Sequence, residues 1–537
     1  MATMRNSGLG NAGRSRKLPA TGTAEGTPPV IVEATTLPPV SIAERRLVFA
    51  GLLLALSLAA LDGNIVGTAL PLIVGDLGGL SHLSWVVTAF LVTSTAATPL
   101  YGKLSDMKGR KPLFFAAIIL FLIGSALCGM ARSMTQLILF RGLQGLGAGG
   151  LFTLSQTTVG DLVAPRERGR YQGLFAGVFA IASVAGPLLG GFITDALSWR
   201  WIFYVNLPVG AAAMGLIAIG LQQRVPPVKH RIDYAGAVLL TAATSTILLF
   251  MSWGGNVYPW VSPEIGGLGA AALVLSFLLI ACERRAEEPM LPPYLFTNRI
   301  FVIAAAVTSL TAMALIGANV FLPLYFQLVE GASASTAGLM IAPLMGGLIC
   351  SSMIGGRLVS ATGRYKIFAV WGLAAATVAY AAMAYVAHFG ADPVLMETAL
   401  TVLGIGIGLV MPNLTTAIQN AVERAQLGVA TSTNGFFRSL GGSFGVGVSG
   451  ALMTGQLQLL LPPEWTRSST GGRSLLEGSV AQIAGLPPSQ HDAIVAAYRH
   501  AIGSTFLAGG GVALFAFLVV LFLPERPLAS EVSASTG

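Results

Sequence analysis

Charged side chains are scarce in this chain of 537 residues: Asp, Glu, Lys and Arg together make up 10% of it, whereas hydrophobic residues make up 54%. Soluble proteins carry about 25% charged residues, so this composition excludes a soluble protein and predicts an integral membrane protein. Cysteine is also rare, with three residues and no C-x-x-C pair. The sequence therefore indicates neither a disulfide framework nor a metal site.

Sequence motifs of enzymes are missing as well. The chain has no P-loop, H-E-x-x-H or G-x-S-x-G pattern, so we expect no catalytic residues and no enzyme activity. Gly145, Gly147 and Gly150 match G-x-G-x-x-G, but they lie inside an apolar run, where small residues serve close helix packing. Basic residues outnumber acidic ones, 31 to 23, yet they are spread over short loops. This distribution argues against nucleic-acid binding.

What the chain does contain is a series of long apolar runs. A membrane-spanning helix needs about 20 mostly apolar residues, and we count fourteen such runs. They predict an all-α membrane protein with both termini on one side. The runs are residues 47–71, 84–104, 112–131, 135–157, 171–194, 200–221, 233–253, 264–282, 300–328, 335–358, 366–388, 393–418, 432–456 and 499–523.

An internal repeat divides these runs into two sets. The stretch from Gly356 to Arg364 matches the stretch from Gly102 to Arg110, with Ser360 in place of Asp106. Two halves around a central site are the organisation of many secondary transporters. We therefore expect a six-helix half over 47–221, inserted helices 7 and 8 over 222–299, and a second six-helix half over 300–523 with an outer loop at about 457–498.

The basic residues indicate the orientation. Short cytoplasmic loops of membrane proteins collect Lys and Arg, and the loop between the second and third runs carries Lys103, Lys108, Arg110 and Lys111. Both termini are then cytoplasmic, in a plasma or inner membrane. Residues 1–46 have no apolar core and 524–537 are short, so we expect two cytoplasmic tails, the first disordered and not a signal peptide.

Asp62, in LDGNIVGTALP, lies well inside the first run. An unpaired charge there is expensive, so an acid in a spanning segment indicates function. Burial favours its neutral form, which suits a group that accepts and releases a proton. Arg141, in the fourth run, is the natural partner. A purely structural salt bridge is the alternative.

Four stretches carry a family resemblance. Gly102-x-Leu-x-Asp106-x-x-Gly109-Arg110-Lys resembles the loop 2–3 signature of the major facilitator superfamily. Arg141-x-x-Gln144-Gly and AGPLLGG, with Gly186, Pro187, Gly190 and Gly191, resemble its fourth-helix and antiporter motifs. The Asp62 stretch is similar to the first-helix motif of the fourteen-helix drug:proton antiporters (EmrB/QacA-like), although Asn64 and Gly67 replace a Thr and an Asn of that motif.

The resemblance implies roles for particular residues. Asp62 and Arg141 would couple protons, while the loop 2–3 and antiporter residues would form a conformational switch, with Asp106 near Arg110 and Arg168 or Arg170. Arg438 would either extend to the cytoplasmic surface or serve the site. The candidate substrate-binding residues are Asn64, Gln144, Glu397, Asn413 and Asn434.

The resemblance also implies a function: proton-coupled multidrug efflux of lipophilic or cationic small molecules, with protons as the only co-substrate and no cofactor or metal. The alternatives are a same-fold exporter of one specific metabolite, lipid or siderophore, and a membrane receptor that does not transport. We expect a monomer in the lipid bilayer and leave accessory envelope proteins open.

Overall fold

The computed structural model describes residues 42–78, 83–221, 233–255, 257–390, 392–462, 483 and 486–528. These residues are almost entirely helical, and the β-structure among them is one isolated bridge between Gly254 and Tyr258. Apolar runs in a membrane must satisfy their backbone groups internally, which a helix does. The all-α membrane fold expected from the sequence is confirmed. Of the expected tail over residues 1–46, residues 1–41 lie outside the described residues, whereas residues 42–46 are helical. Of the expected outer loop at about 457–498, residues 463–482, 484 and 485 lie outside the described residues.

The helices of the first half and the inserted pair follow the apolar runs closely. They are α1 (Ile42–Leu77), α2 (Leu83–Lys108), α3 (Arg110–Gly129), α4 (Met134–Leu162), α5 (Pro165–Ala196), α6 (Trp201–Tyr204), α7 (Asn206–Gly220), α8 (Tyr234–Trp253) and α9 (Pro263–Glu283).

The second half follows in the same manner, with several short helices. These elements are η2 (Pro293–Thr297), α10 (Arg299–Asn319), α11 (Leu322–Leu328), α12 (Ala334–Met340), α13 (Ala342–Thr362), α14 (Lys366–Phe389), α15 (Pro393–Ala421), η3 (Arg424–Gln426), α16 (Leu427–Leu460) and α19 (Pro488–Val520).

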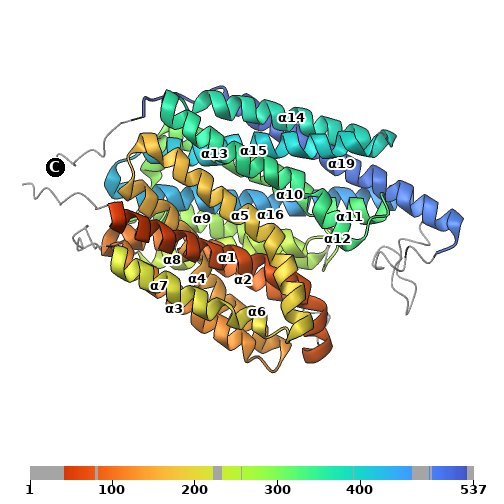
Figure 1. Ribbon diagram of the computed structural model, residues 1–537, viewed down its shortest axis with the longest axis horizontal. Coiled ribbons are helices and arrows are strands. Elements are labelled where there is room, and N and C mark those ends of the chain that lie inside the picture. The colour runs from red at the N-terminus through yellow and green to blue at the C-terminus, as the bar shows by residue number, and fades with distance from the viewer. Residues whose placement is uncertain are drawn as a thin grey trace, which may run out of the picture. The chain divides into compact units, whose positions relative to one another are not determined.

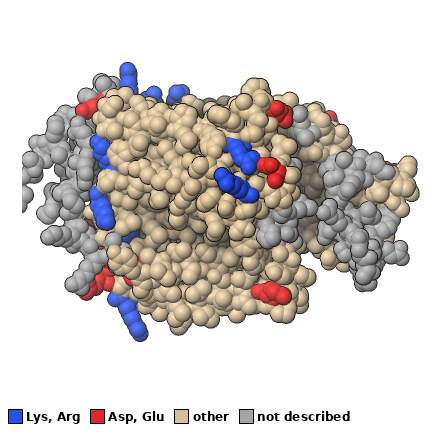
Figure 2. Space-filling model, turned by 90° about the horizontal axis from the view of Figure 1, so that it is seen from below, with Lys and Arg blue, Asp and Glu red and all other residues tan. Residues whose placement is uncertain are grey.

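Among the described residues, twelve helical segments are long and apolar enough to cross a membrane. The two remaining long helices, α2 and α16, are as long but bury polar side chains between helices, including Thr98, Ser105, Thr431 and Asn434. Together these segments correspond to the runs expected from the sequence, and the number that cross the membrane stays a prediction. Figure 2 shows Lys and Arg gathered mainly toward one end of one face, beside a wide uncharged surface.

The helices pack in two groups. In the first, α1 packs on α5 and α7, and α4 packs on α2 and α3; in the second, α15 packs on α13 and α14, while α10 packs on α16 and α19. The inserted helices α8 and α9 pack on each other, and α8 also contacts α2 and α16. Figure 1 shows α5 running from the side of α13 toward α6. The domain boundaries themselves stay a prediction.

The internal repeat has a structural counterpart at two turns. Gly109, between α2 and α3, has a φ of 88°, and Gly363, between α13 and α14, has a φ of 72°. Residues with a Cβ rarely adopt positive φ, so both turns require glycine. We call the end of the bundle that carries the α2–α3 and α4–α5 turns the basic end. It is the end that we expect in the cytoplasm.

The two groups of helices meet closely at the basic end. A Cβ on Gly102 of α2 would overlap the Ser432 side chain of α16, and a Cβ on Gly356 of α13 would overlap the backbone of Gly169 on α5. Gly173 of α5 similarly faces the backbone of α13. Glycine therefore permits the helix approach that closes this end.

We predict that Gly356→Val opens the basic end, because the added side chain cannot fit against Gly169. Gly346→Val, on the same helix, is the matched control, since its added Cβ meets no atom within 4 Å. The measurement is maleimide labelling of Ser432→Cys, a buried position on α16, in a chain without its native cysteines. Labelling should be faster with Gly356→Val than with the control, and equal rates would refute the role of this contact.

Candidate functional site

Asp62 forms an ion pair with Arg141 inside the first group of helices. The Arg141 Nη1 lies 2.5 Å from Asp62 Oδ2, and the side chains are 1% and 0% exposed. The α1 helix supplies the acid and α4 supplies the base. The structure thus brings together the two residues that the sequence singled out for proton coupling.

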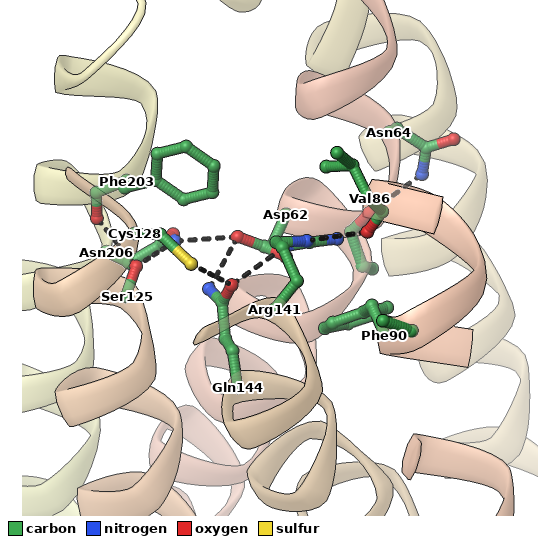
Figure 3. Close-up of polar contacts among 12 residues, drawn as sticks. Asp62, Asn64, Val86, Phe90, Ser125, Cys128, Arg141, Gln144, Phe203 and Asn206 are labelled. Carbon is green, nitrogen blue, oxygen red and sulfur yellow. Dashed lines mark hydrogen bonds and ion pairs between the residues drawn. The ribbon is translucent and has the colours of Figure 1, made fainter. Parts of the chain in front are cut away.

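Further donors complete the hydrogen bonding of Asp62 (Figure 3). Gln144 Nε2 and Asn206 Nδ2 donate to Asp62 Oδ1 at 2.8 and 3.0 Å. Asn206 also donates to Ser125 Oγ at 3.0 Å. A buried carboxylate is stable only when such partners replace water. Here α4 and α7 supply the partners, and Ser125 of α3 holds Asn206 in place.

Arg141 contacts further groups besides Asp62. Its Nη1 donates to Gln144 Oε1 at 2.7 Å, and its Nε donates to the carbonyl of Val86 on α2 at 3.3 Å. The guanidinium carbon lies 4.2 Å from the centre of the Phe90 ring, within the range of a cation–π contact. The Asp62 network, consisting of Asp62, Arg141, Gln144, Asn206 and Ser125, therefore joins α1, α2, α3, α4 and α7.

This arrangement can respond to a proton. Protonation of Asp62 would remove one charge of the pair and leave Arg141 buried beside a weaker acceptor. Buried charges without a partner are costly. Protonation would therefore destabilise this packing of the helices that the network joins, relative to an arrangement in which Arg141 finds other acceptors. The network thus has the chemistry of a proton-sensitive contact.

The antiporter motif packs directly on the helix that carries Asp62. A Cβ on Gly186 of α5 would lie 2.7 Å from the Asn64 Cβ, and one on Gly190 would lie 2.8 Å from the Ile65 carbonyl. Pro187 lies within α5 between them, whereas an added Cβ on Gly191 meets nothing within 4 Å. Gly186 and Gly190 therefore hold α5 against the Asp62 region of α1.

The loop 2–3 residues form a second cluster, at the basic end. Arg110 Nη1 lies 2.6 Å from Asp106 Oδ1, and Arg110 Nε lies 2.7 Å from Asp161 Oδ2 of α4. The backbone N–H groups of Gly428 and Val429 donate to Asp106 at 3.0 and 2.8 Å. Asp106 thus binds the N-terminus of α16, where a helix dipole favours negative charge.

Arg168, an expected neighbour of Asp106, has carbonyl partners. It donates to Gly160 at 2.6 Å, Val163 at 3.0 Å and Gln419 at 3.1 Å. It therefore links the end of α4 to α15 of the other group. Arg170 is exposed.

The predicted substrate-binding residues are not brought to one place. Gln144 is enclosed in the Asp62 network, and Asn64 donates to the Ala60 carbonyl of its own helix at 2.7 Å. Glu397 is exposed on α15, just after the first turn of that helix. Asn413 and Asn434 are buried, and the side-chain oxygen of each has no hydrogen-bond partner among the described residues. Of the five predicted residues, Asn413 and Asn434 are the two that present unpartnered buried polar atoms within the described part of the bundle.

Some functional candidates were missed. Asn206 stands in the Trp199–Pro208 stretch after the antiporter motif, but spacing alone does not show that it faces Asp62. For Arg438, the sequence left open a position at the cytoplasmic surface. The structure instead places its guanidinium carbon 4.1 Å from the centre of the Phe152 ring of α4. A basic residue well inside an otherwise apolar run is the signal that could have found it.

A separate apolar pocket lies beside the inserted helices. It has a volume of about 500 Å³ and is lined by residues of α8, α9, η2 and α16, including Leu279, Phe296, Phe436 and Phe437. Glu283 is a charged residue of its lining and accepts a hydrogen bond from the Leu291 N–H at 2.9 Å. The pocket suits a lipophilic group, and none of the predicted site residues lines it.

Comparison with known sequences settles the family. A profile of the Major Facilitator Superfamily matches residues 52–446. The chain belongs to this superfamily. It is therefore a transporter, and the expectation that it is not an enzyme is confirmed.

Two relatives from Bacillus subtilis (strain 168) support the drug-export branch. The multidrug transporter protein MdtP is 41% identical over 418 residues, which cover 78% of this chain and 77% of that protein. Multidrug resistance protein 3 is 37% identical over 414 residues, which cover 77% of this chain and 80% of that protein.

A solved structure supports the fold. The crystal structure of the human organic anion transporter MFSD10 (TETRAN) matches with a TM-score of 0.61 at 17% sequence identity, covering 89% of this chain and 100% of that chain. At this identity the likeness concerns the fold alone. The membership of the superfamily and the likeness to MdtP, and not this solved structure, support a multi-pass membrane transporter of small molecules.

We predict that Asp62→Leu destabilises the transporter more than Asp62→Leu combined with Arg141→Met. The single change leaves a buried cation without its carboxylate, which costs about 3–5 kcal/mol, whereas removing both charges restores an uncharged contact. Asp76→Asn is the control, since Asp76 and Arg200 form a largely exposed pair at 2.6 Å. The measurement is the melting temperature in detergent; a double variant no more stable than the single one would contradict the pairing argument.

Proposed function

We propose that this transporter is a proton-coupled exporter of lipophilic small molecules, cationic ones included, that exchanges its substrate for protons. The observation that carries the proposal is the Asp62 network: a carboxylate with no exposed surface that is paired with Arg141 and joined to several helices. The names of the two Bacillus subtilis relatives support drug export. The apolar pocket beside α9 supports lipophilic substrates.

Two arrangements of the halves would alternate. The described hydrogen bonds between the halves cluster at the basic end, where Asp106 binds α16 and Arg168 reaches Gln419. With this end in the cytoplasm, the arrangement is closed to the cytoplasm. We take it as the state from which substrate leaves outward, with the proton entering from the same side.

The packing of α1 on α5 would couple the protonation of Asp62 to substrate binding. A ligand shifts a conformational equilibrium only by its different affinity for the two states. Because Asp62 is enclosed, its competition with substrate acts through α1, which packs on α5 at Gly186 and Gly190. Protonation of Asp62 weakens its ion pair with Arg141 and favours one of the two packing arrangements of α1 on α5. Deprotonation of Asp62 on the cytoplasmic side restores the other arrangement.

We predict that Asp62→Asn uncouples efflux from the proton gradient. The amide keeps the size of the side chain and cannot release a proton. We therefore expect gradient-driven ethidium efflux to fall by about tenfold or more, which corresponds to a barrier at least about 1.4 kcal/mol higher. The assay uses vesicles with an imposed proton gradient and equal amounts of each variant. Asp76→Asn, which removes an exposed acid of the same helix, should behave like the parent.

The efflux rates of the parent and of Asp62→Asn distinguish three possibilities. Efflux by the parent that stops with an uncoupler, together with loss of coupling in Asp62→Asn, supports antiport through Asp62. Full coupling in Asp62→Asn would move the proton site elsewhere, with Glu397 as the next candidate. A parent that moves no dye would favour a transporter of one specific metabolite.

We predict a different effect for Asp106→Ala. The change removes the acceptor of the Gly428 and Val429 N–H groups, so it weakens closure at the basic end without altering the Asp62 network. Transport should slow while the protein still inserts and still responds to the proton gradient. The checks are the rate of ethidium efflux and the amount of protein in the membrane; unaltered transport would count against this role.

A further inference from the structure

A second cation lies deep in the bundle. Arg438 follows the start of α16 at Leu427 by eleven residues, and at 1.5 Å per residue this is about 16 Å along the helix, roughly half of a hydrocarbon core of about 30 Å. The start of α16 is fixed at the basic end by its hydrogen bonds to Asp106. Arg438 therefore lies near the middle of the membrane and not at its surface.

The side chain points across the interface between the two groups of helices. Its guanidinium carbon lies 4.1 Å from the centre of the Phe152 ring on α4. A Cβ added to Gly435, about one turn earlier on α16, would lie 3.6 Å from Thr98 Cγ2 and 3.9 Å from the same ring. The Phe152 ring in turn meets Phe179 of α5 edge to face, with centroids 5.5 Å apart. The position faces the centre of the bundle rather than lipid.

The charge of Arg438 is not balanced within the described part of the chain. No described carboxylate lies within ion-pair distance of its guanidinium, and its described contact is the ring face of Phe152. Arg141, by contrast, has Asp62, Gln144 and the Val86 carbonyl. An arginine remains protonated at this depth, and one aromatic face offsets only part of the cost of a charge in the membrane.

Accessible surface and free acceptors adjoin this cation. Arg438 and Phe152 are half-buried and Phe179 is 37% exposed, so each side chain keeps surface that a ligand could contact. The Asn434 Oδ1 and the Gln156 Oε1, one turn from Arg438 and Phe152 along their helices, are buried and have no hydrogen-bond partner among the described residues. The site offers a cation, two rings and two acceptors.

We propose that Arg438, Phe152 and Phe179 form a substrate site for aromatic compounds that carry a carboxylate. The guanidinium binds the carboxylate through paired hydrogen bonds, the rings contact the aromatic part of the compound, and Asn434 and Gln156 accept its hydroxyl or ammonium donors. This inference rests on the proposed efflux function and refines it: the substrates include zwitterions and acids, beyond the cations and neutral lipophiles expected from the sequence.

The test compares two dyes that differ in one group. Rhodamine 110 carries a free carboxylate, and rhodamine 123 is its methyl ester. Fluorescence polarisation measures binding of each dye to the purified full-length protein. The parent should bind the acid about tenfold more tightly than the ester, Arg438→Gln should lose this preference, and Arg438→Lys should keep part of it. Arg364→Gln, which removes an exposed charge after α13, should keep all of it.

Each outcome decides the proposal. Equal binding of acid and ester by the parent overturns it, even if Arg438→Gln fails to fold. A preference that survives in Arg438→Gln, or that is abolished by chloride in place of gluconate, also overturns it, the latter by indicating an inorganic-anion site. Proton-driven uptake of both dyes into inverted vesicles tests transport separately. Acid binding that depends on Arg438 without any transport would uphold the site and refute the efflux function.

Discussion

The buried ion pair between Asp62 and Arg141 is the constraint on which the first half of the molecule depends. Neither charge is stable alone in an apolar bundle, and the pair is stable here because Gln144, Asn206 and the Val86 carbonyl occupy the remaining hydrogen-bonding positions. The positions of α1, α2, α4 and α7 relative to one another are thereby tied to the protonation of one carboxylate.

Helix α4 connects this pair to the contact between the halves. It carries Arg141 in the Asp62 network, Phe152 against Arg438 of α16, and Asp161 against Arg110 at the basic end. Arg141 and Phe152 are eleven residues apart, about 16 Å along a helix. A shift of α4 as one rigid element would therefore reach the proton site, the Arg438 site and the closed end together.

Much of this could be predicted from the sequence, for identifiable reasons. Apolar runs fix the helices, because a membrane leaves the backbone few alternatives, and charged residues such as Asp62 and Arg141 are conspicuous inside those runs. Partners of ordinary type are not conspicuous: Asn206 is one polar residue among many until α7 places it 3.0 Å from Asp62. Gln144, a predicted substrate-binding residue, donates to the Asp62 carboxylate at 2.8 Å. A sequence pattern shows the helix on which a residue lies but not which neighbouring helix that residue faces.

The two buried arginines differ in a way that bears on transport. Arg141 has a carboxylate from its own half, so its charge is balanced whether or not substrate is present. Among the described residues, Arg438 has a ring face from the opposite half as its contact, and that contact exists only while α4 and α16 are close. A charge with so little compensation is most stable when a ligand supplies the anion, so binding at this position acts directly on the contact between the halves. If Asp62 couples protons as proposed, a ligand that prefers the closed arrangement must by linkage also shift the protonation of Asp62. A substrate that never touches Asp62 would then still exchange with a proton.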